Sequence, residues 1–325
     1  MTTVNTENNT QVPAGFRKLT IATLVATLLL IGVGSLVRVS GAGLGCPDWP
    51  TCWGCWFPPS DTSQIDPEKY DITKFNLTKM WIEYANRMVG VTIGLLVLAT
   101  FIQSFQFAKT RPGLFWGSFS AFLLVVFNGW LGGQVVKSGL KPGIITLHMA
   151  LAILQVTVLM WIVHNSRNTQ PLTPGSETMR NLAIGLFAIT TIQLLMGTKV
   201  RETMDPHIKE GDVPREEWIK ANHSSRVGGI IDHTHRMMSW FVVGASILLI
   251  KNSRRLPIGS PPRLITKVII SLVVAEILVG ITLAYVGMPP ASQVLHLVLA
   301  ASLICAEFLL VLYCNKNSSE AELAN

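Results

Sequence analysis

The chain has 325 residues, of which 49% are apolar and only 14% are charged. Soluble domains carry roughly 25% charged residues, whereas a mean hydropathy of +0.43 is typical of proteins with several membrane-spanning helices. The composition therefore excludes a disordered chain and a protein that coats nucleic acid. We interpret the net charge of +7 as a sign of loop topology rather than of an acidic partner.

Eight apolar stretches of about 20 residues follow one another along the chain, each long enough to cross a bilayer. They cover approximately residues 19–37, 80–105, 114–133, 142–163, 181–200, 227–250, 264–286 and 293–313. The sixth is the least apolar, because Asp232, His233, His235 and Arg236 interrupt its first half. Ionisable residues at membrane depth are costly, so we keep them as functional candidates.

The distribution of Lys and Arg between the loops predicts the orientation. An even number of spans places both termini on one side of the membrane. The predicted inner segments hold twelve cationic and four acidic residues, whereas the outer segments hold fourteen and thirteen. We therefore expect cytoplasmic termini and long outer loops at 40–78 and 202–226. The polar N-terminus resembles neither a secretory signal nor a mitochondrial transit peptide, which favours a bacterial cytoplasmic membrane.

The two halves of the chain repeat the same landmarks in the same order. The matched positions are Gly34 and Arg38 with Gly197 and Arg201; Glu83, Asn86 and Arg87 with Asp232, His235 and Arg236; and Gly132, Gly139, Pro142 and His148 with Gly280, Gly287, Pro290 and His296. Because each unit holds four spans, both units have the same orientation, related by an axis along the membrane normal. The sequence predicts an all-α membrane protein whose eight transmembrane helices form two pseudo-symmetric four-helix bundles.

The repeat and the orientation together predict the domain organisation. It comprises a cytoplasmic tail at 1–18, an N-terminal bundle at 19–165 with an outer cysteine loop at 40–78, a cytoplasmic linker at 166–180, a C-terminal bundle at 181–314 and a cytoplasmic tail at 315–325.

Four equivalent positions are predicted to share one depth in the bundles. Asn86, His148, His235 and His296 each follow the outer end of a span by about seven residues, which is roughly 10 Å of helix. Two parallel helices with imidazoles at one level can hold a flat macrocycle by axial ligation of its metal. A lone histidine there is often a hydrogen-bonded core residue. Three at symmetric depth favour a haem site, and His235 and His296 complete a ligand pair.

Arginines accompany these positions on the outer side. Arg87 and Arg236 directly follow two of them, and Arg38 and Arg201 lie at the outer ends of the first and fifth spans. A guanidinium suits the carboxylates of haem propionates. The alternative is that each arginine reaches the lipid headgroups.

A carboxylate and three thiols complete the candidate set. Glu83 precedes Asn86 by three residues, so both lie on one helical face. A poorly solvated carboxylate there is a candidate for proton transfer, and the alternative is a salt bridge to Arg87 or Arg38. Cys46, Cys52 and Cys55 fall in the first outer loop, where a disulfide can persist. Glu276 and Glu307 lie within spans, and a helix–helix hydrogen bond explains each.

These residues resemble a known family, the haem A synthases. The resemblance covers about residues 19–313 and depends on the stretch VSGAGLGCPDWPTC from Val39 to Cys52, the pair Glu83 and Arg87, and the histidines His148, His235 and His296. It implies a haem b cofactor in the C-terminal bundle and a haem O substrate in the N-terminal bundle. The implied reaction oxidises the C8 methyl of haem O to a formyl group by successive hydroxylations, which supplies haem A to terminal oxidases.

The resemblance also implies a role for individual residues. His235 and His296 would ligate the haem b iron, His148 would face the iron of the substrate haem, and Glu83 would be the catalytic carboxylate. Cys46 and Cys52 would be the loop thiols that the family associates with electron or haem transfer. Cys55 is an alternative partner for Cys46, and spacing alone does not choose between them. A zinc site is less favoured, because no nearby histidine completes a ligand set.

Asn86 departs from the family pattern, which has histidine at this position, and a carboxamide is a poor iron ligand. One hypothesis is that His148 alone binds the substrate iron and leaves a coordination position open for oxygen chemistry. Alternatively, His223 or a water molecule fills the place, or the N-terminal site has lost its activity.

The leading hypothesis is therefore a membrane-bound, haem-modifying oxidoreductase. Its expected partners are haem O, a haem O synthase, an electron-transfer partner and membrane lipid, with no nucleic acid. A second hypothesis is a haem b-binding electron-transfer or haem-chaperone protein with an inactive N-terminal site. A third is a secondary transporter, although polar residues clustered at the outer depth rather than at the midplane count against transport.

Overall fold

The computed structural model describes residues 11–168, 177–210 and 217–315, apart from the side chains of 206–210 and 223. The predicted tails at 1–18 and 315–325 and the linker at 166–180 thus lie partly outside the described residues. The chain divides into two compact units, Met1–Ser166 and Arg167–Asn325, and each is described by itself below.

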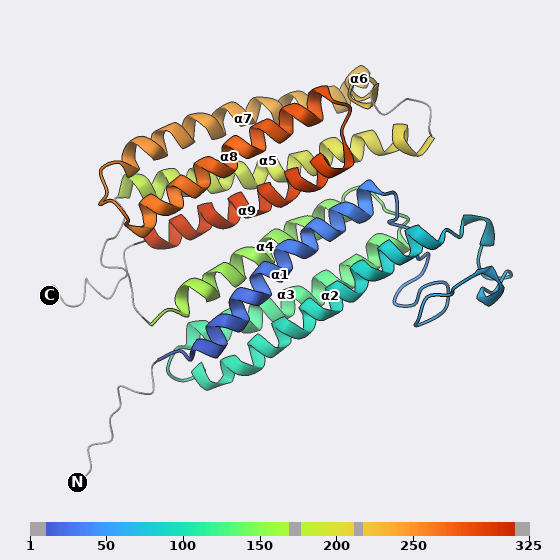
Figure 1. The fold of residues 1–325 in the computed structure, drawn as a ribbon, viewed down its shortest axis with the longest axis horizontal. Coiled ribbons are helices and arrows are strands. Elements are labelled where there is room, and N and C mark those ends of the chain that lie inside the picture. Colours follow the sequence, from blue (N-terminus) through green and yellow to red (C-terminus); the bar gives the residue numbers. More distant parts are fainter. Residues whose placement is uncertain (1–10, 169–176, 211–216, 316–325) are drawn as a thin grey trace, which may run out of the picture. The chain divides into compact units, whose positions relative to one another are not determined.

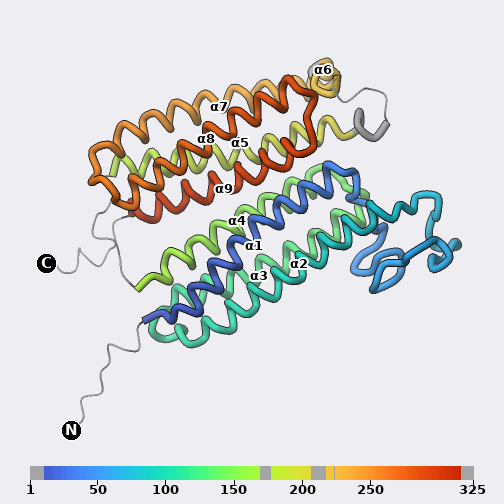
Figure 2. The backbone as a smooth tube through the Cα atoms, viewed as in Figure 1, coloured from blue at the N-terminus to red at the C-terminus, as the bar shows by residue number. Residues whose placement is uncertain are grey.

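Helices make up most of the described structure (Figures 1 and 2). The first unit contains α1 (Ala14–Val39), α2 (Leu77–Ser104), α3 (Pro112–Lys137) and α4 (Ile144–Asn165), with short 3₁₀ turns at Thr62–Gln64, Ile72–Lys74 and Phe105–Phe107. The second contains α5 (Glu177–Glu210), α6 (Trp218–Ser224), α7 (Arg226–Ser253), α8 (Pro261–Tyr285) and α9 (Pro290–Cys314). The predicted all-helical class is confirmed.

Seven of these helices are long and apolar enough to cross a membrane: α1, α2, α3, α4, α5, α8 and α9. A chain of this kind is a multi-pass membrane protein, because a helix satisfies its own backbone hydrogen bonds in lipid. The predicted sixth span, α7, forms a helix as expected but is not among the seven. Its first half carries Asp232, His233, His235 and Arg236, which lower its apolarity. The count of eight spans stays a prediction.

The helix starts differ from the expected ones at the four equivalent positions. Asn86 and His235 lie nine residues after the first residues of α2 and α7, whereas His296 lies six after that of α9 and His148 only four after that of α4. The side chains of Asn76 and Ser225 cap α2 and α7, which starts these helices ahead of the apolar stretch. A turn with positive φ at Gly139, Leu140 and Gly143 delays α4. The helix starts thus do not coincide with the expected span ends, and the shared depth of the four positions in the membrane stays a prediction.

Within each unit, four long helices pack in a closed ring. In the first unit α1 contacts α2, α2 contacts α3, α3 contacts α4, and α4 returns to α1. In the second unit the corresponding contacts join α5 to α7, α7 to α8, α8 to α9, and α9 to α5. One buried apolar cluster there draws on all four helices and includes Leu186, Leu249, Ile269 and Leu310. Side chains on alternate helices of a ring, such as α7 and α9, can therefore meet across its interior.

Candidate functional site

Two histidines face each other inside the second unit. His235 on α7 and His296 on α9 have ring centroids 6.5 Å apart, with ring planes inclined at 81°. Metal bonds to histidine nitrogen of about 2.0–2.1 Å, plus about 1.1 Å from each nitrogen to its ring centre, would place the centroids about 6.3 Å apart. The two rings thus have the separation that a single iron atom between them requires.

The Nδ1 atoms of both rings are turned toward protein acceptors. Nδ1 of His235 lies 3.1 Å from the backbone oxygen of Gln193 on α5. Nδ1 of His296 contacts the Oε2 carboxylate oxygen of Glu276 on α8. Metal-binding histidines usually use one ring nitrogen in this way, which leaves the other nitrogen for the metal. The arrangement presents Nε2 of each ring as a ligand.

Three histidine rings rest on glycines of a neighbouring helix. A Cβ atom added to Gly197 on α5 would lie 3.1 Å from Cε1 of His235, and one added to Gly280 on α8 would lie 3.7 Å from Cε1 of His296. In the first unit, a Cβ on Gly132 would lie 3.3 Å from Cε1 of His148. Ordinary Cβ contacts measure 3.4–4 Å. The repeated glycines thus allow the rings to pack against helix backbone.

The fourth equivalent position differs. A Cβ added to Gly34, the counterpart of Gly197, would meet no atom within 4 Å. Asn86, where the repeat has His235, keeps its side-chain oxygen buried without a hydrogen-bond partner among the described residues. At the equivalent positions, the first unit therefore has His148 packed on a glycine and an open space beside Gly34 on α1. The side chain of His223, the alternative ligand, lies outside the described residues.

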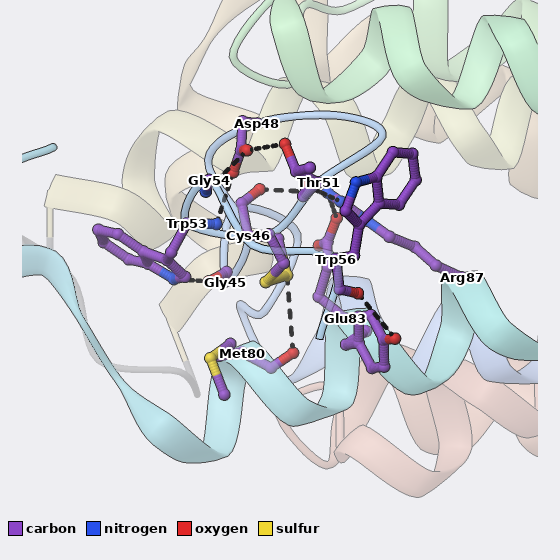
Figure 3. Close-up of a disulfide and its surroundings, with 12 residues drawn as sticks. Gly45, Cys46, Asp48, Thr51, Trp53, Gly54, Trp56, Met80, Glu83 and Arg87 are labelled. Atoms are coloured by element: carbon purple, nitrogen blue, oxygen red, sulfur yellow. Dashed lines mark hydrogen bonds and ion pairs between the residues drawn. A yellow bond between two sulfur atoms is a disulfide. The ribbon is translucent and has the colours of Figure 1, made fainter. Parts of the chain in front are cut away.

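Glu83 and Arg87 form a buried ion pair on α2. Nη2 of Arg87 lies 3.0 Å from Oε1 of Glu83, and the side chains are only 10% and 5% exposed, respectively. The same guanidinium donates to the backbone oxygens of Thr51 at 2.7 Å and Cys46 at 3.3 Å (Figure 3). Arg87 is one of the two partners expected for Glu83 in the structural alternative, and it pairs with the carboxylate. Arg87 thus joins the carboxylate to the outer loop.

The outer loop contains one disulfide, between Cys46 and Cys52 (Figure 3). Both cysteines are fully buried, with Trp53, Ile65 and Met80 in the same apolar cluster. Cys55 is a free thiol. Its backbone pairs with that of Cys52 through two hydrogen bonds of 2.9 and 3.2 Å. The structure therefore resolves the pairing that spacing left open.

Asp48 organises the turn between these cysteines. Its carboxylate accepts hydrogen bonds from the backbone N–H groups of Trp53 at 2.6 Å and Gly54 at 3.0 Å, and from the hydroxyl of Tyr70 at 3.3 Å. Burial, and to a smaller degree the negative charge of Asp48, raise the pKa of Tyr70. The loop is thus a small folded element with its own polar centre.

The remaining predicted arginines are engaged with protein groups or lie at a helix end. Nε of Arg236 lies 2.9 Å from Oδ2 of Asp232, the counterpart of the Glu83 pair. Arg201 contacts Asp205 and donates from Nε to Gln293 at 3.3 Å. Arg38 is the penultimate residue of α1. Arg38 thus lies at the C-terminal end of α1, and Arg201 and Arg236 form ion pairs within α5 and α7.

Comparisons with known proteins give this geometry its context. The model of the COX15-CtaA family, described as cytochrome oxidase assembly protein, matches residues 17–308. The chain belongs to this family. Among curated relatives, the Heme A synthase of Shewanella oneidensis is 24% identical over 300 residues, or 84% of this chain and 89% of the relative. That of Sphingopyxis alaskensis is 26% identical over 317 residues, or 87% of each. The resemblance stated from the sequence is confirmed.

Sequence reasoning did not connect Gln193 or Glu276 with the two histidines. The backbone oxygen of Gln193 lies near Nδ1 of His235, and the carboxylate of Glu276 contacts Nδ1 of His296. Each lies four residues before a glycine that faces a histidine ring, and Asn128 has the same offset from Gly132. For Glu276 and Asn128, that shared offset is a signal that the internal repeat contained. The hydrogen bond expected for Glu307 is present, since the Thr190 hydroxyl lies 3.0 Å from its Oε1.

Proposed function

We propose that the protein is a haem A synthase, an oxidoreductase that converts the C8 methyl group of haem O into a formyl group within the membrane. The family match and the relatives named Heme A synthase support this activity. The observation that carries the proposal is the pair formed by His235 and His296, which has a separation suited to iron and both Nδ1 atoms facing acceptors.

In this proposal His235 and His296 hold haem b, and Arg201 and Arg236 lie on the side where its propionates would be placed. The fit is supported by Gly197 and Gly280, against which the imidazoles of His235 and His296 pack inside the four-helix bundle. Haem b, when bound, supplies one-electron transfer. The protein's contribution is to fix which nitrogen of each imidazole is presented.

The first unit would bind the substrate haem. His148 would face its iron, Arg38 and Arg87 would lie toward its propionates, and Asn86 would line the opposite face. With water as the oxygen source, each hydroxylation replaces a hydrogen of the methyl group by a hydroxyl, releases two protons and passes two electrons to the electron-transfer partner. Loss of water from the twice-hydroxylated carbon then gives the formyl group. Because each hydroxylation releases protons, a buried carboxylate close by can accept them.

Glu83 is the residue that we assign to this proton transfer. Arg87 engages Oε1 of Glu83, which fixes the carboxylate and leaves Oε2 as the atom to accept a proton. The guanidinium is itself held by the carbonyls of Cys46 and Thr51. The ion pair thus has a positioning role as well as the structural one that the sequence suggested.

The proposed setting is a bacterial cytoplasmic membrane with cytoplasmic termini. All eight long helices would span it as two pseudo-symmetric bundles, roughly 19–165 and 181–314. The seven apolar helices and the matching helix contacts in the two units support this arrangement. A haem O synthase and an electron-transfer protein are the proposed partners, because one must supply the substrate and the other must exchange electrons.

The deciding experiment expresses the protein in a bacterium that makes haem O but lacks its own haem A synthase. Chromatography of extracted haems is expected to reveal haem A, and a haemochrome spectrum of the purified protein is expected to reveal haem b. The variant His235→Ala, expressed at the same level, should lose both signals. A purified protein that retains haem b while the cells accumulate only haem O would refute the synthase assignment.

A further inference from the structure

Glu276 is an acid in α8 whose closest polar partner is a histidine. Its Oε2 contacts Nδ1 of His296 across the α8–α9 interface, and its side chain is only 13% exposed. Its second oxygen, Oε1, is buried without a hydrogen-bond partner among the described residues. By contrast, Glu83 and Asp232 pair with arginines on their own helices. The His296 ring is therefore the main polar contact of this carboxylate.

The two histidines of the pair have different kinds of acceptor group beside Nδ1. Gln193 and Glu276 occupy the same offset before a ring-facing glycine, yet they serve their histidines differently. Gln193 offers a neutral backbone oxygen to His235, while its side chain bonds to Ser239 at 2.8 Å. Glu276 offers a carboxylate. The two imidazoles thus have unequal partners.

We propose that Glu276 is a positioning residue that fixes Nε2 of His296 toward the haem b iron and holds the reduction potential of that haem low. This inference rests on the proposed function, because it requires haem b between His235 and His296. A carboxylate acceptor on Nδ1 raises the basicity of the imidazole as a ligand, and second-shell hydrogen bonds are a known means of tuning haem potentials. A more basic ligand favours the ferric over the ferrous state.

The test compares Glu276→Gln and Glu276→Leu with Glu307→Gln as the matched control. Glu307 is a fully buried acid within α9, and its partner is Thr190 rather than a histidine. Haem content, the low-spin spectrum of the ferric protein and the midpoint potential are measured on purified protein. We expect Glu276→Gln to favour the ferrous state about tenfold relative to wild type, a shift of about 59 mV for one electron. Glu276→Leu should also lose haem about tenfold more readily.

Each outcome separates this inference from the proposed function. Wild-type protein without a bis-histidine haem spectrum would overturn both. If the wild type shows that spectrum but its haem has the same midpoint potential as in Glu276→Gln, only the role of Glu276 is overturned. Equal shifts in Glu276→Gln and Glu307→Gln would also overturn it, because they would report general charge removal rather than the histidine contact.

A separate feature lies at the other end of the second unit, where a hollow opens between α7 and α8. Its volume is about 360 Å³, and its lining includes the cations Arg254, Arg263 and Lys267 with Ile250 and Ile270. No acidic residue occurs from 251 to 275. Arg263 also donates to the Leu256 backbone oxygen at 3.0 Å. On each side of the hollow, the isoleucine is farther along the chain from the α7–α8 turn than the cations of the same side, Ile250 relative to Arg254 and Ile270 relative to Arg263 and Lys267.

We infer that this hollow binds the phosphate headgroup of an anionic phospholipid. Basic hollows between helices at the membrane surface attract anionic headgroups, and guanidinium groups pair well with phosphate. Cations near the turn and isoleucines deeper along the helices match a phosphate joined to acyl chains. Free phosphate could bind the same cations but has no acyl chain to contact Ile250 and Ile270.

The experiment measures thermal unfolding in phosphatidylcholine nanodiscs with and without phosphatidylglycerol. Phosphatidylglycerol should stabilise the wild type, and the double variant Arg254→Gln with Lys267→Gln should lose about half of this gain or more. Lys251→Gln with Arg255→Gln is the control, since it removes equal charge from the same segment outside the lining. Equal losses in both double variants would overturn the site. Equal stabilisation by inorganic phosphate in phosphatidylcholine would overturn the lipid assignment.

Discussion

Replacing the four repeated glycines by alanine should separate packed positions from the open one. A methyl group at Gly197 would lie 3.1 Å from the His235 ring, whereas one at Gly34 would meet nothing within 4 Å. Gly132 and Gly280 are intermediate, at 3.3 and 3.7 Å. The same substitution at the four glycines thus places a methyl group at four different distances from its nearest neighbour.

The expected magnitudes follow from these distances. Alanine is favoured over glycine in a helix by about 0.5–1 kcal/mol, so Gly34→Ala should stabilise the protein by that amount. Gly197→Ala receives the same benefit but forces the imidazole to move by several tenths of an ångström, and overpacking of this kind costs about 1–3 kcal/mol. We therefore expect Gly197→Ala to be the least stable of the series and Gly34→Ala the most stable, with Gly132→Ala near Gly197→Ala.

Thermal unfolding in detergent, followed by circular dichroism, measures the series, and haem content reports whether the ring has moved. Gly94→Ala on α2 is the control for helix propensity alone, because a Cβ there also meets nothing within 4 Å. Gly34→Ala should resemble Gly94→Ala. The reasoning would be refuted if Gly34→Ala destabilised the protein as much as Gly197→Ala, or if Gly197→Ala matched Gly94→Ala.

Three further substitutions test the first unit. Asn86→His should place an imidazole over the open surface of Gly34 and change the free energy of unfolding by less than about 1 kcal/mol. A large gain in haem A formation would show that the asparagine limits activity. A variant that fails to fold would contradict the open space beside Gly34. Glu83→Gln should reduce haem A formation by at least about 10²-fold with haem b unchanged, and activity close to wild type would remove Glu83 from proton transfer. Asp48→Ala leaves the N–H groups of Trp53 and Gly54 without an acceptor, at about 1–3 kcal/mol each, so limited proteolysis should cut the loop faster; an unchanged rate would contradict its role.

The membrane helices were predictable because their apolar stretches are long and separated by turns. The predicted stretches lie within the observed helices to within two residues at either end. The start of α4 was not predictable from hydropathy, because it depends on the positive φ angles of Gly139, Leu140 and Gly143. Hydropathy reports where a chain is apolar, whereas backbone angles decide where the helix begins.

The site was predictable where it depended on the repeat and unpredictable where it depended on helix rotation. The symmetric spacing identified His235 and His296, and the structure brings them together. The contact of Glu276 with His296 requires particular rotations of α8 and α9, which spacing alone does not specify. The choice of Cys52 over Cys55 depends on a turn with positive φ at Trp53 and Gly54, which the cysteine spacing did not reveal.

The guanidinium of Arg87 connects the loop that contains Cys46 and Thr51 to the buried carboxylate of Glu83. Its two carbonyl partners belong to the segment that the disulfide closes, because Cys46 is one of the bonded cysteines and Thr51 directly precedes the other. Opening that segment would withdraw both carbonyls and free Arg87 to turn away from Glu83. A change in the thiols at the membrane surface would then reach the carboxylate through a single side chain, without any movement of the helices.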